Sequence, residues 1–189
     1  MDRLKYIIPT KEYKDKAIDY INEFYKYHSR IHGVGELDKY LDDYDAWLIK
    51  LSNDRSRNLS KMHVPTETYF LVRESDDSIV GMINIRLTSN DSLIDRSGHI
   101  GYSIRPTERR KGYAKINLYM GLKCLNEHNI DVALVFCVKS NLASSKTMLS
   151  LGAKKYGESY SDKYKEVIEK YKIDVNKSLN EYAFLYYNI

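Results

Sequence analysis

The sequence has few of the residues that mark specialised classes of protein: 2 cysteines, 3 prolines and 1 tryptophan in 189 residues. Cys124 and Cys137 form no C-x-x-C pair, so they supply neither a disulfide framework nor a zinc ligand set, and we expect buried, reduced thiols. The longest clean apolar run, VALVFCV at 132–138, is far too short to span a bilayer. We therefore expect no membrane partner.

The sequence also lacks a large excess of charge of either sign. Its 30 Lys and Arg residues against 26 Asp and Glu give a net charge of +4. A nucleic-acid-binding protein usually concentrates its cations on one face, whereas these are spread along the chain, so we expect no nucleic-acid partner. The N-terminal segment lacks the apolar core of a secretory signal, which leads us to expect a cytoplasmic protein.

The composition is that of a globular protein, with 43% hydrophobic and 30% charged residues. The length suits one domain over residues 1–189 with one buried core. Helix-like and strand-like segments alternate along much of the chain, which predicts an α/β fold.

Apolar periodicity predicts the elements and their order. The predicted helices, the first of them capped by Thr10, cover residues 10–27, 37–51, 112–126 and 142–151. The predicted strands cover residues 4–9, 68–72, 79–87, 99–104, 132–138, 153–160 and 180–189. The run at 132–138 is apolar throughout, which is typical of a strand buried on both faces. Residues 52–63 lack a period and predict a loop, and residues 161–178 suit a helix or an extended segment equally.

A cationic turn stands between the strand predicted at 99–104 and the helix that follows. It consists of Arg109, Arg110, Lys111, Gly112, Tyr113 and Ala114. Successive backbone N–H groups at such a helix start make a concave anion site, and the glycine lets a ligand reach the backbone. The flanking cations suit a pyrophosphate, and we expect the ligand rather than the protein to balance them. A solvated helix start with surface cations and a nucleic-acid contact are the alternatives.

Two motifs together resemble the signatures of the GNAT family of acyl-CoA-dependent N-acetyltransferases. The first, Gln/Arg-x-x-Gly-x-Gly/Ala, is matched by Arg109, Gly112 and Ala114. The second, within NLASSKTMLSLGA, is matched by Asn141, Ser144, Gly152 and Ala153. The resemblance covers residues 65–155 well, and several segments are most similar to a bacterial branch of the family for which no substrate is implied.

The resemblance implies a GNAT acyltransferase fold, a mixed central sheet with a splayed parallel strand pair flanked by helices. Acetyl-CoA would enter between the strands at 99–104 and 132–138, with no metal involved. Its pantetheine arm would pair with the backbone of Tyr102, Ser103 and Ile104, and residues 109–114 would hold the pyrophosphate. Asn141 and Ser144 would contact the cofactor, although Asn141 also suits a plain helix cap.

The implied reaction is direct attack of a primary amine, on a small molecule or a peptide, at the thioester. His99 is the first candidate for the base and Glu67 a weaker one, while a packed strand histidine is the alternative for His99. Many relatives carry a tyrosine acid where this chain has Met148, which leaves the acid open. A non-catalytic acyl-CoA-binding regulatory module is therefore the alternative function.

Other residues invite functional interpretations that we weigh against simpler ones. His28 and His32 are four positions apart, but no carboxylate or cysteine completes a metal set, so we interpret them as a surface pair. Tyr44 and Trp47 belong to an apolar helical stripe that predicts core, with a wall of the acceptor site as the alternative. A homodimer is left open.

Overall fold

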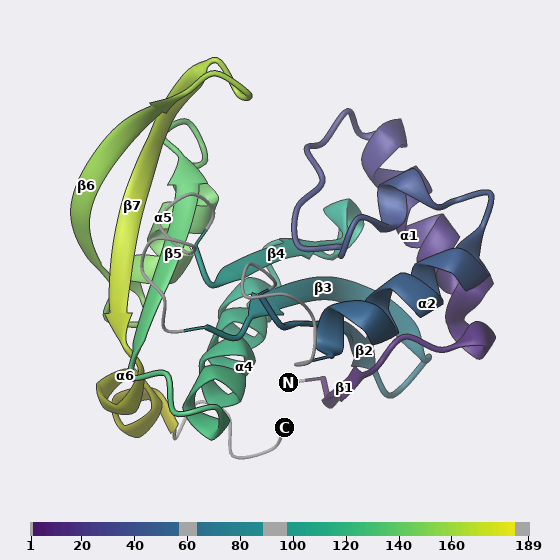
Figure 1. The fold of residues 1–189 in the computed structure, drawn as a ribbon, viewed down its shortest axis with the longest axis horizontal. Helices are drawn as coiled ribbons and strands as arrows, with labels where there is room; N and C mark the ends of the chain where they lie inside the picture. The colour runs from purple at the N-terminus through teal and green to yellow at the C-terminus, as the bar shows by residue number, and fades with distance from the viewer. Residues whose placement is uncertain (1, 57–63, 89–97, 184–189) are drawn as a thin grey trace.

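The computed structural model describes residues 2–56, 64–88 and 98–183, whose strands form two antiparallel sheets (Figure 1). The first sheet has the order β1-β2-β3-β4, with β1 at Leu4–Ile7, β2 at Thr66–Arg73, β3 at Ser78–Arg86 and β4 at Ile100–Ile104. The second has the order β5-β7-β6, with β5 at Val132–Val138, β6 at Lys154–Ser161 and β7 at Glu166–Asp174.

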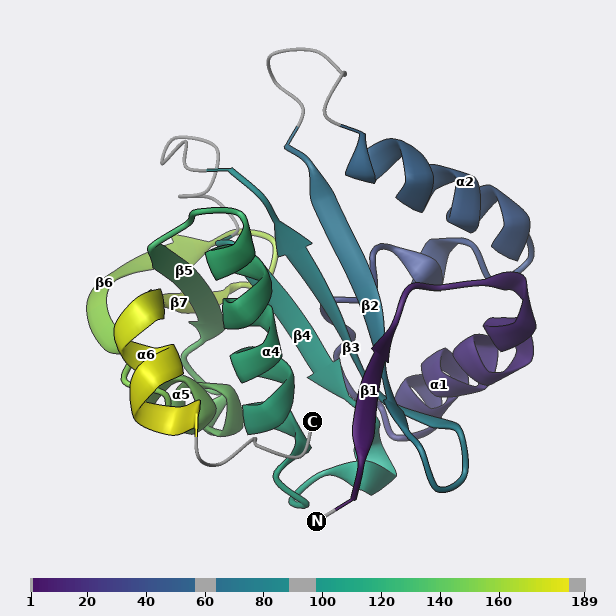
Figure 2. The same ribbon diagram turned by 90° about the horizontal axis from the view of Figure 1, so that it is seen from below.

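Helices cover both faces of the first sheet (Figure 2). The helices α1 (Lys14–Lys26) and α2 (Tyr44–Arg55) lie against one face, and α4 (Tyr113–Glu127) lies against the other. The helices α5 (Leu142–Leu149) and α6 (Val175–Tyr182) pack beside α4, and three short 3-10 turns are η1 (Lys11–Tyr13), η2 (Leu37–Lys39) and η3 (Pro106–Glu108). In the described ranges, no helix combines the length and apolarity needed to cross a membrane.

Alternation along the strands divides the interior into two cores. On β2, Phe70 and Val72 face α1 and α2, whereas Leu71 faces α4, because successive strand side chains point to opposite faces. The first core gathers aromatic residues such as Trp47, and the second gathers the aliphatic side chains between α4 and both sheets. Both faces of the first sheet are therefore anchored, which makes it a rigid base for a site.

The two sheets meet at one short joint, where β4 begins. The His99 N–H donates to the Leu134 carbonyl at 2.7 Å, and the Leu134 N–H donates to Nδ1 of the His99 ring at 2.9 Å. Among the described residues, no ladder of hydrogen bonds between β4 and β5 continues from this joint. The two strands therefore diverge, and β5 pairs with β7 along its other edge. The α/β fold with a splayed strand pair is confirmed, but the sheet we expected as one is divided in two.

Helix starts differ from the prediction because local capping competes with apolar spacing. Thr10 makes no side-chain cap, and α1 begins only at Lys14, after η1. The helix predicted over 37–51 begins at Tyr44, where the Asp43 carboxylate accepts from the Ala46 N–H at 3.0 Å. The preceding residues form η2 and a turn, yet the predicted stripe is packed in the first core.

The C-terminal third also departs from the prediction. The open segment 161–178 contains β7 and the start of α6, and residues 180–182 of the predicted last strand are helical. Residues 184–189 lie outside the described part of the chain, as do residues 57–63 of the loop predicted after α2. The strand β5 is buried on one face only, because Phe136 on its other face borders a cavity.

Candidate active site

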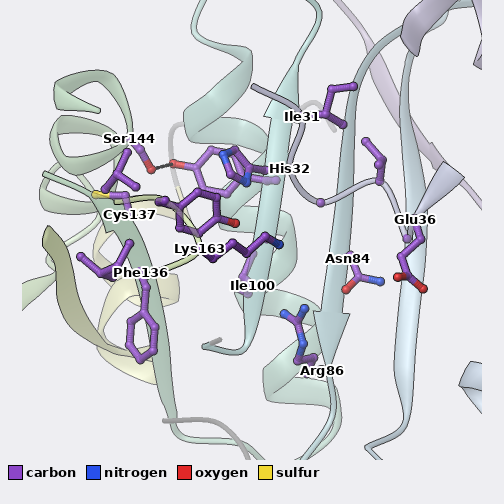
Figure 3. A pocket seen from close by; sticks show the side chains of 18 of the residues that line it. Ile31, His32, Glu36, Asn84, Arg86, Ile100, Phe136, Cys137, Ser144 and Lys163 are labelled. Atoms are coloured by element: carbon purple, nitrogen blue, oxygen red, sulfur yellow. Dashed lines mark hydrogen bonds between the residues drawn. The ribbon is translucent and has the colours of Figure 1, made fainter. Parts of the chain in front are cut away.

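A cavity of about 980 Å³ lies where β4 and β5 diverge (Figure 3). Residues 100–102 of β4 form one side and residues 136–138 of β5 the other. Further walls come from the connection between α1 and α2 (residues 31–39) and from the tip of the β6–β7 hairpin (residues 159–164), and residues of α2, β2, β3, β7 and the start of α5 complete the lining. Segments far apart in the sequence therefore line one cavity that is partly open to solvent.

The hairpin tip closes over the cavity by contacting the α1–α2 connection. The Arg30 guanidinium lies 3.3 Å from the Glu166 carboxylate and 6.0 Å from the Tyr164 ring. The rings of His32 and Tyr164 lie 5.9 Å apart. These contacts form a roof over part of the cavity.

Gly33 allows the α1–α2 connection to press against β4. Its φ is +68°, and a Cβ at this position would lie 2.2 Å from the Gly101 carbonyl oxygen. Behind it, Trp47 donates from Nε1 to the Gly35 carbonyl at 2.8 Å. The core thus holds this wall of the cavity in place.

The cationic turn lies at the far end of β4 and has the backbone geometry of an anion cradle. Arg110 and Gly112 both have positive φ values, 64° and 86°. Among the described residues, the N–H groups of Arg110, Lys111 and Gly112 have no backbone acceptor, and Gly112 stands at the N-cap of α4 without a side-chain cap. These free donors, together with the first amides of the helix, can surround an anion.

The three cations of the turn are not equally available to a ligand. Lys111 pairs with Glu108 at 2.7 Å, and Arg109 donates to the Ser29 hydroxyl at 2.7 Å and to the Ile104 carbonyl at 3.3 Å. Arg110 is exposed and has no ion pair within the described ranges. Our expectation that the ligand alone balances this charge is wrong for Lys111, since Glu108 neutralises it.

Across the cavity from β4, the start of α5 presents polar groups. The Asn141 side chain accepts from the Ser144 N–H at 3.1 Å, which confirms its role as a helix cap. The Tyr102 and Ser144 hydroxyls lie 3.2 Å apart and bridge β4 to α5. All three residues line the cavity, whereas Ser103 and Ile104 are buried and do not.

His99 holds the joint between the sheets. Its Nδ1 accepts from the Leu134 N–H, and its Nε2 lies 3.0 Å from the Thr88 carbonyl, so the ring is a neutral tautomer with both nitrogens engaged. The side chain is buried and does not line the cavity. This geometry supports the structural alternative, and a role as base stays a prediction.

Glu67 lies on the sheet face opposite the cavity. It accepts from the Tyr69 hydroxyl and lies 3.4 Å from the Cys124 sulfur, whereas the preceding residue, Thr66, lines the cavity. Burial, and then the nearby Glu67 carboxylate, raise the pKa of the Cys124 thiol. The geometry therefore gives no support to Glu67 as a base.

Tyr44 and Trp47 are fully buried core residues, as the apolar stripe predicts. The Tyr44 hydroxyl donates to the Thr10 carbonyl at 3.0 Å, and neither side chain lines the cavity. The structure thus does not place them in an acceptor wall. Cys124 and Cys137 are free, buried thiols as predicted.

The sequence interpretation missed His32, which lines the cavity and is half-buried. Our interpretation of a surface pair is wrong for this residue, although His28 is exposed. Burial lowers the pKa of His32 below its ordinary value of 6.5, and the cations Arg30 and Lys163 add to the effect. The lowered pKa leaves the imidazole neutral near pH 7. Its ring makes no hydrogen bond within the described part of the chain, so it is available to a ligand.

Sequence spacing could not have identified His32, because its position depends on the roof. The glycines that follow it, Gly33 and Gly35, were the available signal for a special loop conformation. No cluster of three or more His, Cys, Asp or Glu side chains suited to a metal ion is found over residues 2–56, 64–88 and 98–183.

Comparisons with known proteins agree with this geometry. Residues 14–154 match the family model described as an acetyltransferase (GNAT) domain. No curated protein sequence matches the chain.

Several solved structures share the fold at low sequence identity. Ribosomal-protein-S5-alanine acetyltransferase from Vibrio fischeri is 16% identical with a TM-score of 0.72, over 92% of this chain and 94% of that one. A GNAT-family acetyltransferase from Bacillus anthracis is 15% identical with a TM-score of 0.64, over 93% and 96%. A chimera of the spermidine N-acetyltransferase SpeG from Vibrio cholerae with hSSAT is 12% identical with a TM-score of 0.64, over 94% and 99%.

Proposed function

Because the chain belongs to the GNAT family of acetyltransferases, we propose that it transfers an acetyl group from acetyl-CoA to a primary amine. One observation carries the proposal: β4 has an open wedge beside its first residues and a cradle of free N–H groups beyond its last. A pantetheine arm and its pyrophosphate need these two features in this order along one strand.

The residues around β4 fit such a cosubstrate. The N–H groups of residues 110–114 would hold the pyrophosphate, with Arg110 adding charge. The backbone edge of residues 102–104 would pair with the pantetheine amides as an added strand does. The strand rises by about 3.3 Å per residue, so Ile100 and Ile104 stand roughly 13 Å apart, which matches an extended arm running between cradle and cavity.

His32 is the base that the geometry favours. An amine attacks only when neutral, and a neutral imidazole at the cavity wall can take the proton that the amine loses. The new N–C bond forms as the C–S bond of the thioester breaks, and the proton passes to Nδ1 or Nε2 of His32. The nearby Arg30 and Lys163 also favour the neutral form of the amine, because they repel an ammonium group.

Tyr102 is the donor that we assign to the departing thiolate. It lines the wedge between β4 and α5, and burial raises its pKa to about 12, so the hydroxyl stays protonated at neutral pH. Met148 cannot serve, since it is a thioether and is packed in the second core. The acid thus comes from the facing strand and not from α5.

The alternative is a regulatory module that binds acyl-CoA without turnover, and the absence of an acid at Met148 favours it. Following thiol release from acetyl-CoA across a panel of primary amines distinguishes the two. We expect release that depends on the acceptor. Tight acetyl-CoA binding without such release would favour the module, and failure to bind acetyl-CoA would refute both.

A further inference from the structure

We propose that the acceptor is a small amino carboxylic acid whose carboxylate binds Arg86 on the cavity floor. The inference rests on the acetyl transfer proposed above and specifies the acceptor of that reaction. It starts from three observations about the cavity: a guanidinium without a carboxylate partner, an excess of cations in the lining, and a small polar amide beside the guanidinium.

Arg86 ends β3 at the level of the joint, where its backbone N–H donates to the His99 carbonyl at 2.8 Å. Its side chain is half-buried, lines the cavity and donates to the Gly98 carbonyl at 3.3 Å (Figure 3). Within the described ranges no carboxylate lies within ion-pair distance of it. A partly desolvated guanidinium gains most from an anion, because burial has removed much of its hydration.

The charges that line the cavity are unequal. The cationic side chains are Lys39, Lys50, Arg86, Lys163 and Lys170, and the carboxylates are Glu36, Asp38 and Asp54. Lys39 pairs with Glu36, and Lys50 lies 3.3 Å from Glu36 and 2.5 Å from Asp54, so these two lysines balance two of the three carboxylates. Arg86, Lys163 and Lys170 then face Asp38 alone among the charged lining residues. Lys163, on the hairpin tip, has no ion pair among the described residues. The lining thus favours an anionic group and disfavours a polycation.

Asn84 supplies the second polar contact. It lies two residues before Arg86 on the same face of β3, and its Nδ2 donates to the Thr68 hydroxyl at 2.9 Å. That bond orients the amide, and its oxygen has no hydrogen-bond partner among the described residues. Side chains two positions apart on a strand stand roughly 6.6 Å apart, a span that suits an amine and a carboxylate on one small molecule.

Size supports the same conclusion. The cavity of about 980 Å³ must hold the acetylated end of the pantetheine arm as well as the acceptor. The contacts between Arg30, Glu166 and Tyr164 form a roof over part of it. A free amino acid fits the space that is left, whereas a folded protein terminus would have to open this roof.

The experiment compares amino acids with their carboxamides as acceptors, in the wild type and in Arg86→Gln. The amides keep the amine and the side chain but lack the negative charge. We expect wild-type kcat/KM to be at least 10-fold higher for the acids, roughly the gain of one charge-assisted hydrogen bond of 1.5–3 kcal/mol. Arg86→Gln should remove that preference by raising KM for the acids only, and Arg86→Lys should restore part of it.

Two controls separate this inference from the proposed function. Arg3→Gln makes the same substitution at an exposed site outside the cavity and should change nothing. Calorimetric titration of amino acids into the CoA complex reads the carboxylate site without turnover, so it tests the inference even if no acceptor is acetylated.

Three results would overturn the carboxylate site. One is equal or better turnover of amides or spermidine by the wild type. Another is an equal fall in kcat for acids and amides in Arg86→Gln, which would place the guanidinium at the reacting thioester. The third is a loss of acetyl-CoA affinity in that variant as large as the loss of acceptor affinity. Acceptor-dependent thiol release in any of these cases would leave the proposed acetyl transfer standing.

Discussion

The donor side and the acceptor side of the cavity are built in different ways. The proposed donor side is one continuous stretch, β4 followed by the cationic turn and the start of α4, and most of its functional groups are backbone N–H and C=O, with side chains only at Tyr102 and Arg110. The acceptor side is assembled from β3, the α1–α2 connection and the hairpin tip, and its functional groups are side chains such as Arg86, His32 and Lys163. In the proposed reaction, backbone groups would bind a constant cosubstrate, whereas side chains from separate segments can vary with the acceptor.

The difference predicts where each substitution acts. A change on the donor side should weaken cosubstrate binding whatever the acceptor, since the backbone cradle is shared by all reactions of the site. A change on the acceptor side should leave cosubstrate binding intact and alter rate or acceptor choice.

The largest effect should come from His32→Gln. Removing a general base lowers kcat by roughly 10²–10⁴-fold, while acetyl-CoA affinity should stay unchanged. In the wild type, kcat/KM should fall as the pH drops through the pKa of His32, which lies below 6.5, because protonation removes the base. The variant should lose this acidic limb.

His28→Gln is the matched control, since His28 is an exposed histidine four positions away. It should retain the wild-type rate and pH profile. If the His32 variant kept the acidic limb of the pH profile, another residue would be the base. The acceptor wall would then have no role in proton transfer.

A smaller effect, on the donor side, should follow Gly112→Val. The φ of +86° is strained for a β-branched residue, and the side chain would stand between a ligand and the amides. A valine would relax the turn away from this conformation, and restoring it to bind the ligand would cost about 1–3 kcal/mol. That cost corresponds to an acetyl-CoA affinity loss of roughly 5- to 150-fold. Calorimetric titration of acetyl-CoA measures it directly.

Gly157→Val provides the comparison, because Gly157 has an ordinary φ and a Cβ added there would meet no atom within 4 Å. We expect its acetyl-CoA affinity to match the wild type. Unchanged acetyl-CoA affinity in the Gly112 variant would show that the cationic turn does not bind the pyrophosphate. The distinction between a backbone-built donor side and a side-chain-built acceptor side would then be wrong.

The smallest catalytic effect should come from His99, which belongs to neither side. His99→Ala should lower the free energy of unfolding by about 1–3 kcal/mol, because the Leu134 N–H and the Thr88 carbonyl lose their contacts with the ring at the joint. His99→Asn keeps an acceptor near the position of Nδ1 and should recover part of that loss, with kcat within a few-fold of the wild type. Denaturant unfolding and steady-state rates on the same samples make the comparison.

A kcat that collapses equally in both His99 variants, with the acidic limb gone, would restore His99 as the base. His32 would then be a wall residue only.

Several predictions from sequence succeeded where the signal was local. The cationic turn, the cap at Asn141 and the core stripe around Trp47 each depend on neighbours along the chain, and each is found where expected, whereas the cap predicted at Thr10 is not formed. Roles that depend on strand register could not be predicted from the sequence. His99 and Glu67 lie on or beside predicted strands, yet neither lines the cavity. Successive side chains of a strand point to opposite faces, so an error of one residue in register places a side chain on the wrong face.

The sequence by itself determined the α/β class, most elements up to β5 and the cationic turn, since helix periodicity, glycine conformation and capping act over a few residues. It did not determine β7 and α6 near the C-terminal end of the described residues. Only the tertiary structure decided which side chains share the cavity. The cavity depends on three arrangements between segments far apart in the sequence. They are the divergence of β4 and β5, the close approach of Gly33 to Gly101, and the contact of Tyr164 with His32. Packing between segments that are distant in the sequence places His32 and Arg86 in the lining of the same cavity. No local sequence pattern could predict this, because local patterns depend only on residues a few positions apart.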